Sequence, residues 1–206
     1  GSAGRDDVLV FGVIDWAFRM QRPQHLAREL ARRGLRVFYL APNPVLVPKP
    51  GFSIERVDAE LPIHQIRLHA PAMLSIYAGT PPPAVLEALT AGLRALLAHV
   101  AIGPNVAIVD HPGWVALARL VPRSRLVYDC MDDHHGFATA NAALVADEER
   151  LLAAARLVVV SSNALANAMR RMLADVPPAM VRNACDPQHF VAARKQARTA
   201  RPVVGY

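Results

Sequence analysis

The sequence predicts a doubly wound α/β fold, with a mostly parallel, open sheet of the Rossmann-like class and helices on both of its faces. Short apolar runs alternate with amphipathic stretches along most of the 206 residues, and such alternation is typical of strand–helix–strand units. The runs are continuously apolar, as expected of parallel strands buried on both faces. A closed eight-fold barrel usually needs ~250 residues. The sequence therefore favours the open sheet.

The first strand–helix–strand unit lies at the start of the chain. The run VLVFGVI over 8–14 predicts a buried strand. Pro23 suits the first turn of a helix, where its missing N–H costs nothing, and Gly34 suits the position just past the helix end. Apolar residues spaced three to four apart lie between these positions, and RVFYLA over 36–41 predicts the second strand.

The same alternation continues towards the C-terminus, where further apolar runs predict strands and amphipathic stretches predict helices. The expected strands are 52–57, 63–69, 106–110, 125–129, 156–162 and 179–184, and the expected helices are 83–100, 112–120, 139–155 and 163–173.

We expect one globular domain over residues 5–190. A composition of 53% hydrophobic and 19% charged residues suits a sizeable core. Residues 1–4 are interpreted as an unstructured remnant of a cleaved tag. Residues 191–206 begin as a basic, helix-prone linker and end in PVVGY, which we expect to be the first strand of a truncated second domain. A natural terminus with one final edge strand is the alternative.

The chain is basic, with a net charge of +6 and a pI of about 10.0. Only Lys49 and Lys195 are lysines among the 23 basic residues. A solvated, arginine-rich surface explains most of this charge, and attraction to an anionic membrane surface or a sugar phosphate is the second interpretation. Nucleic acid is not expected as a partner, because the basic residues rarely interleave with aromatics and no nucleic-acid motif occurs.

The sequence indicates a cytoplasmic protein. No apolar run reaches the ~18 residues that a membrane-spanning helix needs, and no signal peptide precedes the first strand. Cys130 and Cys185 are too few for a disulfide scaffold and lack metal-ligand spacing. We therefore expect two free thiols.

The polar and aromatic clusters of the chain follow the ends of the predicted strands. Ligands of open α/β sheets bind beyond the carboxyl ends of the strands, so these clusters predict a site at that edge. The clusters are DWAFRMQRPQH after the first strand, DHPGW after 106–110, DCMDDHHGF after 125–129, Ser161, Ser162 and Asn163 after 156–162, and RNACDPQHF after the last strand.

The turn after the first strand does not fit a nucleotide site. A dinucleotide site needs glycines there so that the backbone can approach pyrophosphate, and no GxxxxGK[ST] motif occurs. Trp16, Phe18 and Arg22 occupy the turn instead. We expect it to present guanidinium groups to an anion and aromatic faces to a sugar or lipid, although Arg22 could instead be paired with an aspartate of another strand end.

The segment DCMDDHHGF offers three carboxylates and two imidazoles. Adjacent aspartates at a strand end can include a general base, particularly where burial raises one pKa. Asp129 is expected to be structural, and a polar loop with helix-capping aspartates is the alternative for the whole segment. His111, His134 and His135 with these aspartates could hold a divalent metal, but adjacent histidines converge poorly on one ion, and we expect no metal.

Several of these motifs, in order and spacing, resemble the N-terminal half of bacterial GT-B glycosyltransferases. The subgroup that they most resemble makes exopolysaccharide or cell-wall polymers such as teichuronic acid. The matching stretches are W…R.QRPQHLA..LA.RG.RV.YL, VYDCMDD…F, E..LL..A.LVVVSS..L, VRNACDPQHF and the closing RPVVGY. The chain departs from the pattern at Ala184 and Cys185, where many relatives carry Gly and Val.

The resemblance implies two Rossmann-like domains that face each other across a cleft. The C-terminal domain, beyond this chain, would hold most contacts to the nucleotide-sugar donor, which is a substrate, so that no cofactor is expected. This half would receive a glycan or lipid-linked acceptor for cell-surface polysaccharide synthesis, at the inner face of the membrane, and would be inactive alone. The expected acceptor-binding residues are Trp16, Arg19, Arg22, Gln24, His111 and His134.

Asp132 and Asp133 are the catalytic candidates, because they lie in the loop after a predicted central strand, at the edge where the acceptor is expected, beside two histidines. We expect Asp132 to contact the acceptor hydroxyl and Asp133 to cap a helix. Retention of stereochemistry is the outcome that the resemblance favours. A sugar-nucleotide epimerase of the same architecture and a non-catalytic sugar- or polymer-binding module are the alternatives.

Overall fold

The computed structural model describes residues 7–73, 75–136, 141–173, 177–185 and 187. The described elements, in chain order, are β1 (Asp7–Phe11), α1 (Arg22–Arg32), β2 (Arg36–Leu40), β3 (Val45–Leu46), β4 (Phe52–Arg56), β5 (Ile63–Ala70), η1 (Ile76–Ala78), α2 (Pro83–His99), β6 (Asn105–Val109), η2 (Pro112–Trp114), α3 (Val115–Ala118), β7 (Ser124–Cys130), α4 (Ala142–Ala154), β8 (Leu157–Val160), α5 (Asn163–Met172) and β9 (Ala179–Met180).

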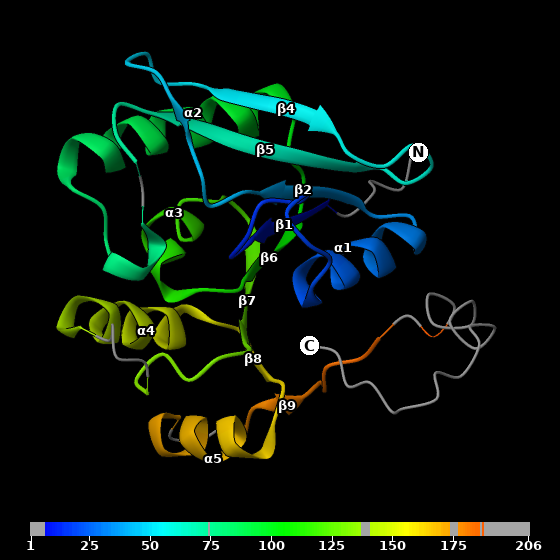
Figure 1. Ribbon diagram of the computed structural model, residues 1–206, viewed down its shortest axis with the longest axis vertical. Helices are drawn as coiled ribbons and strands as arrows, with labels where there is room; N and C mark the ends of the chain where they lie inside the picture. The colour runs from blue at the N-terminus through cyan, green and yellow to red at the C-terminus, as the bar shows by residue number, and fades with distance from the viewer. Residues whose placement is uncertain (1–6, 74, 137–140, 174–176, 186, 188–206) are drawn as a thin grey trace, which may run out of the picture.

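The strands form one open sheet in the order β3-β5-β2-β1-β6-β7-β8-β9, and β4 also pairs with β5 (Figure 1). Every described pairing is parallel except that of β4 with β5. From β1 the chain adds strands first on one side, through β2 and β5, and then on the other side, from β6 to β9. This change of direction at β1 is the hallmark of a doubly wound sheet. The predicted fold class is therefore confirmed.

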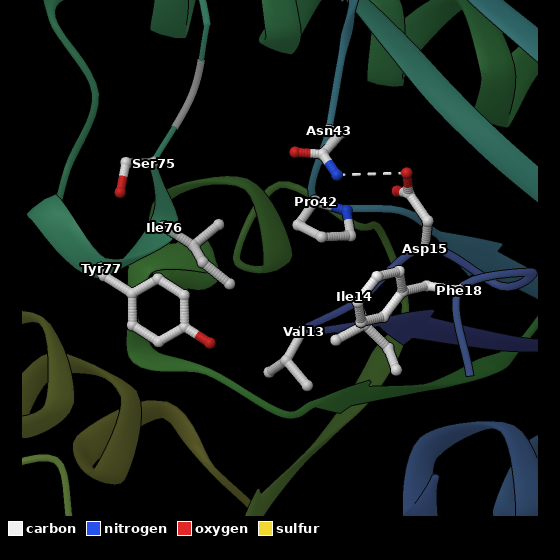
Figure 2. Close-up of a pocket in the computed structure, with 9 residues that line it drawn as sticks. All are labelled: Val13, Ile14, Asp15, Phe18, Pro42, Asn43, Ser75, Ile76 and Tyr77. Carbon is white, nitrogen blue, oxygen red and sulfur yellow. Dashed lines mark hydrogen bonds between the residues drawn. The ribbon is translucent and has the colours of Figure 1, made fainter. Parts of the chain in front are cut away.

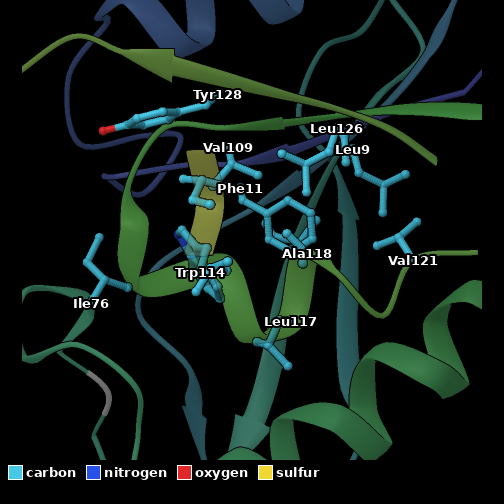
Figure 3. Close-up of a cluster of buried hydrophobic side chains, with 14 of the residues drawn as sticks. Leu9, Phe11, Ile76, Val109, Trp114, Leu117, Ala118, Val121, Leu126 and Tyr128 are labelled. Carbon is cyan, nitrogen blue, oxygen red and sulfur yellow. The ribbon is translucent and has the colours of Figure 1, made fainter. Parts of the chain in front are cut away.

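Two hydrophobic clusters lie on opposite faces of the sheet. Alternate residues of β1 point to each side: Leu9 and Phe11 join a large cluster with α2, α3, α4 and α5, whereas Val8 and Val10 join a smaller cluster with α1. Trp114 lies in the centre of the large cluster (Figure 3). Burial on both faces explains why the strand runs are continuously apolar.

Helix α1 begins and ends as its sequence predicts. Pro23 lies in its first turn, and Gly34, with a φ of 90°, follows its end. The amide of Gln21 donates to Gln24 Oε1 at 3.1 Å and so satisfies one donor of the first turn. No described helix is long and apolar enough to cross a membrane.

Several element boundaries differ from the expectations. The strand expected over 8–14 ends at Phe11, and the last expected strand is β9 alone. After β9 the amide of Val181 still donates to Val160, but the carbonyls of Val181 and Arg182 accept from Arg22. The helix expected from 139 begins at Ala142, where the Asn141 side chain accepts from the amide of Leu144. The elements β3 and η1 were not predicted. Residues 1–4 and 191–206 lie outside the described residues.

Candidate functional site

A groove of about 320 Å³ opens at the carboxyl edge of the sheet, beside the ends of β1 and β2 (Figure 2). Three segments far apart in the sequence form it: the turn after β1, the turn after β2 and the stretch that enters η1. Its lining residues are Val13, Ile14, Asp15, Phe18, Pro42, Asn43, Ser75, Ile76 and Tyr77. The groove lies where an open sheet of this kind binds its ligands.

Asp15 is the charged side chain among the lining residues. Its Oδ2 accepts a hydrogen bond from Asn43 Nδ2 at 3.1 Å and forms an ion pair with an Arg67 nitrogen at 3.3 Å. Its Oδ1 is buried and accepts no hydrogen bond from any residue that the structure describes. The amide and the guanidinium therefore fix the carboxylate but leave part of its acceptor capacity unused.

Aromatic side chains stand on two sides of the groove. Figure 2 shows Tyr77 on one side and Phe18 on the other. Phe18 is 71% exposed and Tyr77 is 46% exposed, whereas Ile76 beside Tyr77 is buried in the large cluster. The groove thus combines exposed ring faces with a fixed polar wall.

Two buried histidines pack behind Tyr77. The ring of His111 lies edge-on to Tyr77 at 4.7 Å and to His134 at 4.6 Å. The Nδ1 of His111 accepts from the amide of Gly113 at 3.1 Å, so its proton lies on Nε2. Burial, and secondarily His134, lowers the pKa of His111 to about 3, and burial also lowers the pKa of His134. Both rings are neutral at physiological pH and support the groove wall from within.

The loop after β7 meets the groove at Tyr77. Its His134 packs against His111, which in turn packs against Tyr77. Burial raises the pKa of Tyr77 above its ordinary value, and the charge of Asp132 raises it further. Partial burial also raises the pKa of Asp132 itself. Asp133 instead accepts from the amide of Gly136 at 3.3 Å and closes a turn. The two adjacent aspartates thus have different surroundings.

A buried network anchors this loop to α4. Tyr128 donates to Glu148 Oε1 at 2.5 Å, and His135 Nε2 lies 2.7 Å from Glu148 Oε2. Glu148 is buried, whereas His135 is partly exposed. The loop is therefore held at both ends, by β7 and by α4.

Arg22 is engaged in an ion pair with a strand end. Its Nε and one terminal nitrogen each bind Asp129 at 2.8 Å, and the other terminal nitrogen donates to the carbonyl of Val181 at 2.8 Å. The interpretation that Arg22 pairs with an aspartate is therefore confirmed. The expectation that it binds an acceptor anion stays a prediction; in the structure these contacts engage its donors and its side chain is only 9% exposed.

Trp16 and Gln24 also have structural roles. Trp16 is 7% exposed and packs edge-on against Tyr39, with ring centroids 5.3 Å apart. Gln24 is fully buried and donates to the carbonyl of Arg19 at 2.8 Å while it caps α1. Their expected contact with an acceptor stays a prediction, and the structure shows them in packing and capping contacts. Arg19 stays exposed, with its guanidinium 5.5 Å from the centroid of Phe18.

Asp110 is the most unusual carboxyl group at this edge. It is fully buried, and neither oxygen has a hydrogen-bond partner among the described residues. Burial, followed by the charge of Asp129, raises its pKa well above the ordinary value. Burial thus favours the protonated, neutral form of Asp110. Both the neutral Asp110 and the groove itself were missed by sequence reasoning, although the motif PNP after the second strand is a turn signal at the right edge.

The comparisons with known proteins support the fold. No known protein family and no curated protein matches the sequence. A structure of sucrose-phosphate synthase from Thermosynechococcus elongatus is 14% identical with a TM-score of 0.57, over 92% of this chain and 94% of that one. The catalytic domain of starch synthase IV from Arabidopsis thaliana, bound to ADP and acarbose, is 8% identical with a TM-score of 0.55, over 91% of this chain. This chain spans 53% of that domain.

Proposed function

We propose that this chain is the acceptor-side domain of a glycosyltransferase, which moves a sugar from a nucleotide-sugar donor to a glycan or lipid-linked acceptor. The observation that carries the proposal is the groove at the carboxyl edge, with Asp15 and Asn43 in its polar wall and Tyr77 opposite. The fold that bears this groove is shared with a sucrose-phosphate synthase and a starch synthase, both of which are glycosyltransferases.

The nucleotide-sugar donor is assigned mainly to a second domain, and no cofactor is proposed. A pyrophosphate site after β1 would need glycines that let the backbone approach the phosphates. The turn instead carries Trp16, whose ring packs into the core. This edge is therefore better suited to the acceptor than to the nucleotide.

Asp132 is the residue that we propose to act on the acceptor hydroxyl. In an inverting transfer the acceptor oxygen bonds to the anomeric carbon, the bond from that carbon to the phosphate oxygen breaks, and Asp132 takes the hydroxyl proton. A raised pKa suits a carboxylate to this task, because a general base works best when its pKa approaches the operating pH. In a retaining transfer, which the sequence resemblance favours, the donor phosphate takes the proton and Asp132 orients the hydroxyl.

Residues around Asp132 have supporting roles in this proposal. His111 and His134 hold Tyr77 in place as neutral rings, and Asp133 shapes the turn. Arg19, exposed beside Phe18, lies at the outer rim, where it can meet a charged or lipid-borne part of the acceptor.

We further propose that the acceptor is lipid-linked, that the product is a cell-surface polysaccharide and that the protein works at the cytoplasmic face of the membrane. The net charge of +6 supports attraction to an anionic surface, at roughly 1 kcal/mol per cation close to it. Flotation with anionic and neutral liposomes tests this. Association with anionic liposomes that weakens at high salt is expected, and indifference to both lipid charge and salt would refute it.

The catalytic proposal is tested with the full-length protein. Labelled UDP-, ADP- and GDP-glucose are incubated with glycan and lipid-linked acceptors, and transfer of label to an acceptor is expected. The 206-residue chain alone is expected to transfer none. Turnover that grows linearly with the concentration of the short chain would contradict the division between two domains. Conversion of the donor sugar without an acceptor would instead indicate an epimerase, and acceptor binding without turnover would indicate a binding module.

A further inference from the structure

The groove has a polar wall in which a single carboxylate has unused acceptor capacity. Asp15 Oδ2 receives two donors, from Asn43 and Arg67, whereas Oδ1 receives none from the described residues. A buried polar atom without a hydrogen bond costs stability, so a bound group that donates to it recovers that cost. Oδ1 is covered in the structure, so a ligand hydroxyl meets this carboxylate at Oδ2, or at Oδ1 once the carboxylate turns about its last torsion, which is broad.

Asp15 and its two partners belong to three different strands or to the turns that follow them, and this anchors the carboxylate. Asp15 follows β1, Asn43 follows β2, and Arg67 lies within β5. Because β5, β2 and β1 are neighbours in the sheet, these side chains are anchored by the same parallel framework. A group fixed in this way binds a ligand with little loss of side-chain entropy.

The charge of the groove disfavours anionic ligands. No cation occurs among the nine lining residues. The two arginines nearest to the strand ends, Arg22 and Arg67, are each already in an ion pair, and Arg19 lies outside the lining. A phosphate or carboxylate in the groove would therefore face the Asp15 carboxylate without an unpaired cation from the lining, at a cost in free energy.

Aromatic surface on both sides of the groove favours a flat, apolar ring face. Tyr77 and Phe18 expose aromatic surface, and the Ser75 and Tyr77 hydroxyls add hydrogen-bonding groups (Figure 2). A pyranose ring has C–H groups on its faces and hydroxyl donors around its edge, so it matches an aromatic wall and a carboxylate wall at once.

We propose that the groove binds an uncharged, hydroxyl-bearing ring of the pyranose class, that Asp15 accepts a hydrogen bond from one of its hydroxyls, and that the groove discriminates against anionic sugars. This inference deepens the proposed function, since it takes the ring to be part of the acceptor. Arg67 and Asn43 are positioning residues that act through Asp15.

The probe pair is methyl β-D-glucopyranoside and the corresponding methyl glucuronide, which differ by one carboxylate. Each is titrated to 100 mM into the 206-residue chain and followed by amide NMR shifts. The glucoside is expected to shift the amides of Asp15, Phe18, Asn43, Ser75 and Tyr77, with an affinity at least tenfold higher than that of the glucuronide. No shift with either sugar, shifts mapped elsewhere, or equal affinity for the two would overturn the proposal.

Variants of groove residues test whether Asp15 and Phe18 cause the difference in affinity between the two sugars. Asp15→Asn keeps the shape of the side chain but removes its charge, and is expected to weaken glucoside binding about tenfold and to narrow the gap between the two sugars. Phe18→Ala, at an exposed position, is expected to weaken glucoside binding several-fold in a fully folded chain, so it serves if Asp15→Asn unfolds. Glu87→Gln, an exposed carboxyl group on α2, is the matched control and should change neither affinity. Unchanged affinity in both groove variants would contradict the proposal.

The outcomes separate this inference from the proposed function. If the glucoside binds in the groove but the full-length protein transfers no sugar, the proposed function fails and the inference stands. If the full-length protein transfers sugar and the groove variants leave the acceptor KM unchanged, the inference fails and the proposed function stands.

Discussion

Arg22, the first residue of α1, holds Asp129 of β7 through two hydrogen bonds of 2.8 Å each. The pair is nearly buried, with Asp129 only 2% exposed. Arg22 also donates to the carbonyls of Val181 and Arg182. One guanidinium thus joins a helix, a central strand and the segment that leaves the sheet after β9.

Removal of one partner of this pair is expected to destabilise the fold. Asp129→Ala leaves the guanidinium of Arg22 buried without its counter-ion, which typically costs about 3–5 kcal/mol. Urea unfolding measures the loss. Arg22→Lys should also be costly, because an ammonium cannot reproduce the two parallel hydrogen bonds. A loss below ~1 kcal/mol in Asp129→Ala would show that the pair contributes little, and a selective rise of the acceptor KM in Arg22→Lys would restore a binding role.

Asp110→Asn is expected to stabilise the chain at neutral pH and not in acid. The folded chain holds the proton of Asp110 to a pH well above the ordinary value of 3.8. Between these two pH values the folded state binds more protons than the unfolded state, so stability falls as pH rises. Asparagine has no proton to lose, so Asp110→Asn avoids this loss of stability. We expect the variant to be more stable than the parent chain by on the order of 1 kcal/mol at pH 7.

Urea unfolding at pH 4 and pH 7 tests this expectation. The free energy of unfolding of Asp110→Asn should exceed that of the parent chain at pH 7 and equal it near pH 4. Glu87→Gln, at the exposed control position, should show no such difference between the two pH values. A variant that is less stable than the parent at both would mean that the Asp110 carboxyl group has an essential partner.

Under the proposed function, Asp132 and Asp133 are expected to respond differently to substitution in the full-length protein. Asp132→Asn should lower kcat by ~10²-fold if Asp132 takes the acceptor proton, with an unchanged thermal midpoint. Asp133→Ala removes the side-chain acceptor at 3.3 Å but leaves the Gly136 amide bonded to the carbonyl of residue 133 at 3.1 Å, so it should lower the midpoint by no more than roughly 2–4 °C, which corresponds to ~1 kcal/mol. Parallel measurements of kcat and Tm decide between them. Full activity in Asp132→Asn would remove its proposed role as a base.

Gly113→Ala is expected to disturb the groove from beneath. A Cβ at Gly113 would lie 2.2 Å from the carbonyl oxygen of Ile76, so η1 must move away from η2. Overpacking of this kind costs about 1–3 kcal/mol, and the shift should also weaken glucoside binding. Gly103→Ala is the control, since its Cβ would meet nothing within 4 Å. If the two variants behave alike in unfolding and in binding, the contact between η1 and η2 does not support the groove.

The sequence was sufficient to predict the sheet because its central strands are buried on both faces and therefore leave continuous apolar runs. It also identified the carboxyl edge, because strand ends can be located from those runs. It could not distinguish which polar or aromatic side chains at that edge turn inward. Trp16 and Gln24 are of residue types that suit a binding site, yet they pack into the core and cap α1.

The groove was not predictable for a related reason. Asp15, Asn43 and Tyr77 belong to three segments that only the tertiary fold brings together, and no spacing along the chain records that. The neutral state of Asp110 depends likewise on burial beneath neighbouring elements. Arg22 could be paired correctly with a strand-end aspartate as one option, but the choice of Asp129 required the sheet order.

The two buried imidazoles behind Tyr77 make the chain sensitive to acid. The unfolded chain takes up protons on its histidines near the ordinary value of 6.5, whereas folded His111 does so only near pH 3. Between these two pH values the unfolded chain binds a proton at His111 and the folded chain does not. The contribution of His111 to stability therefore rises with pH from about 3 to 6.5. Asp110 has the opposite slope. The pH at which these two groups together favour folding most is therefore set by one carboxyl group that keeps its proton and one histidine that stays neutral.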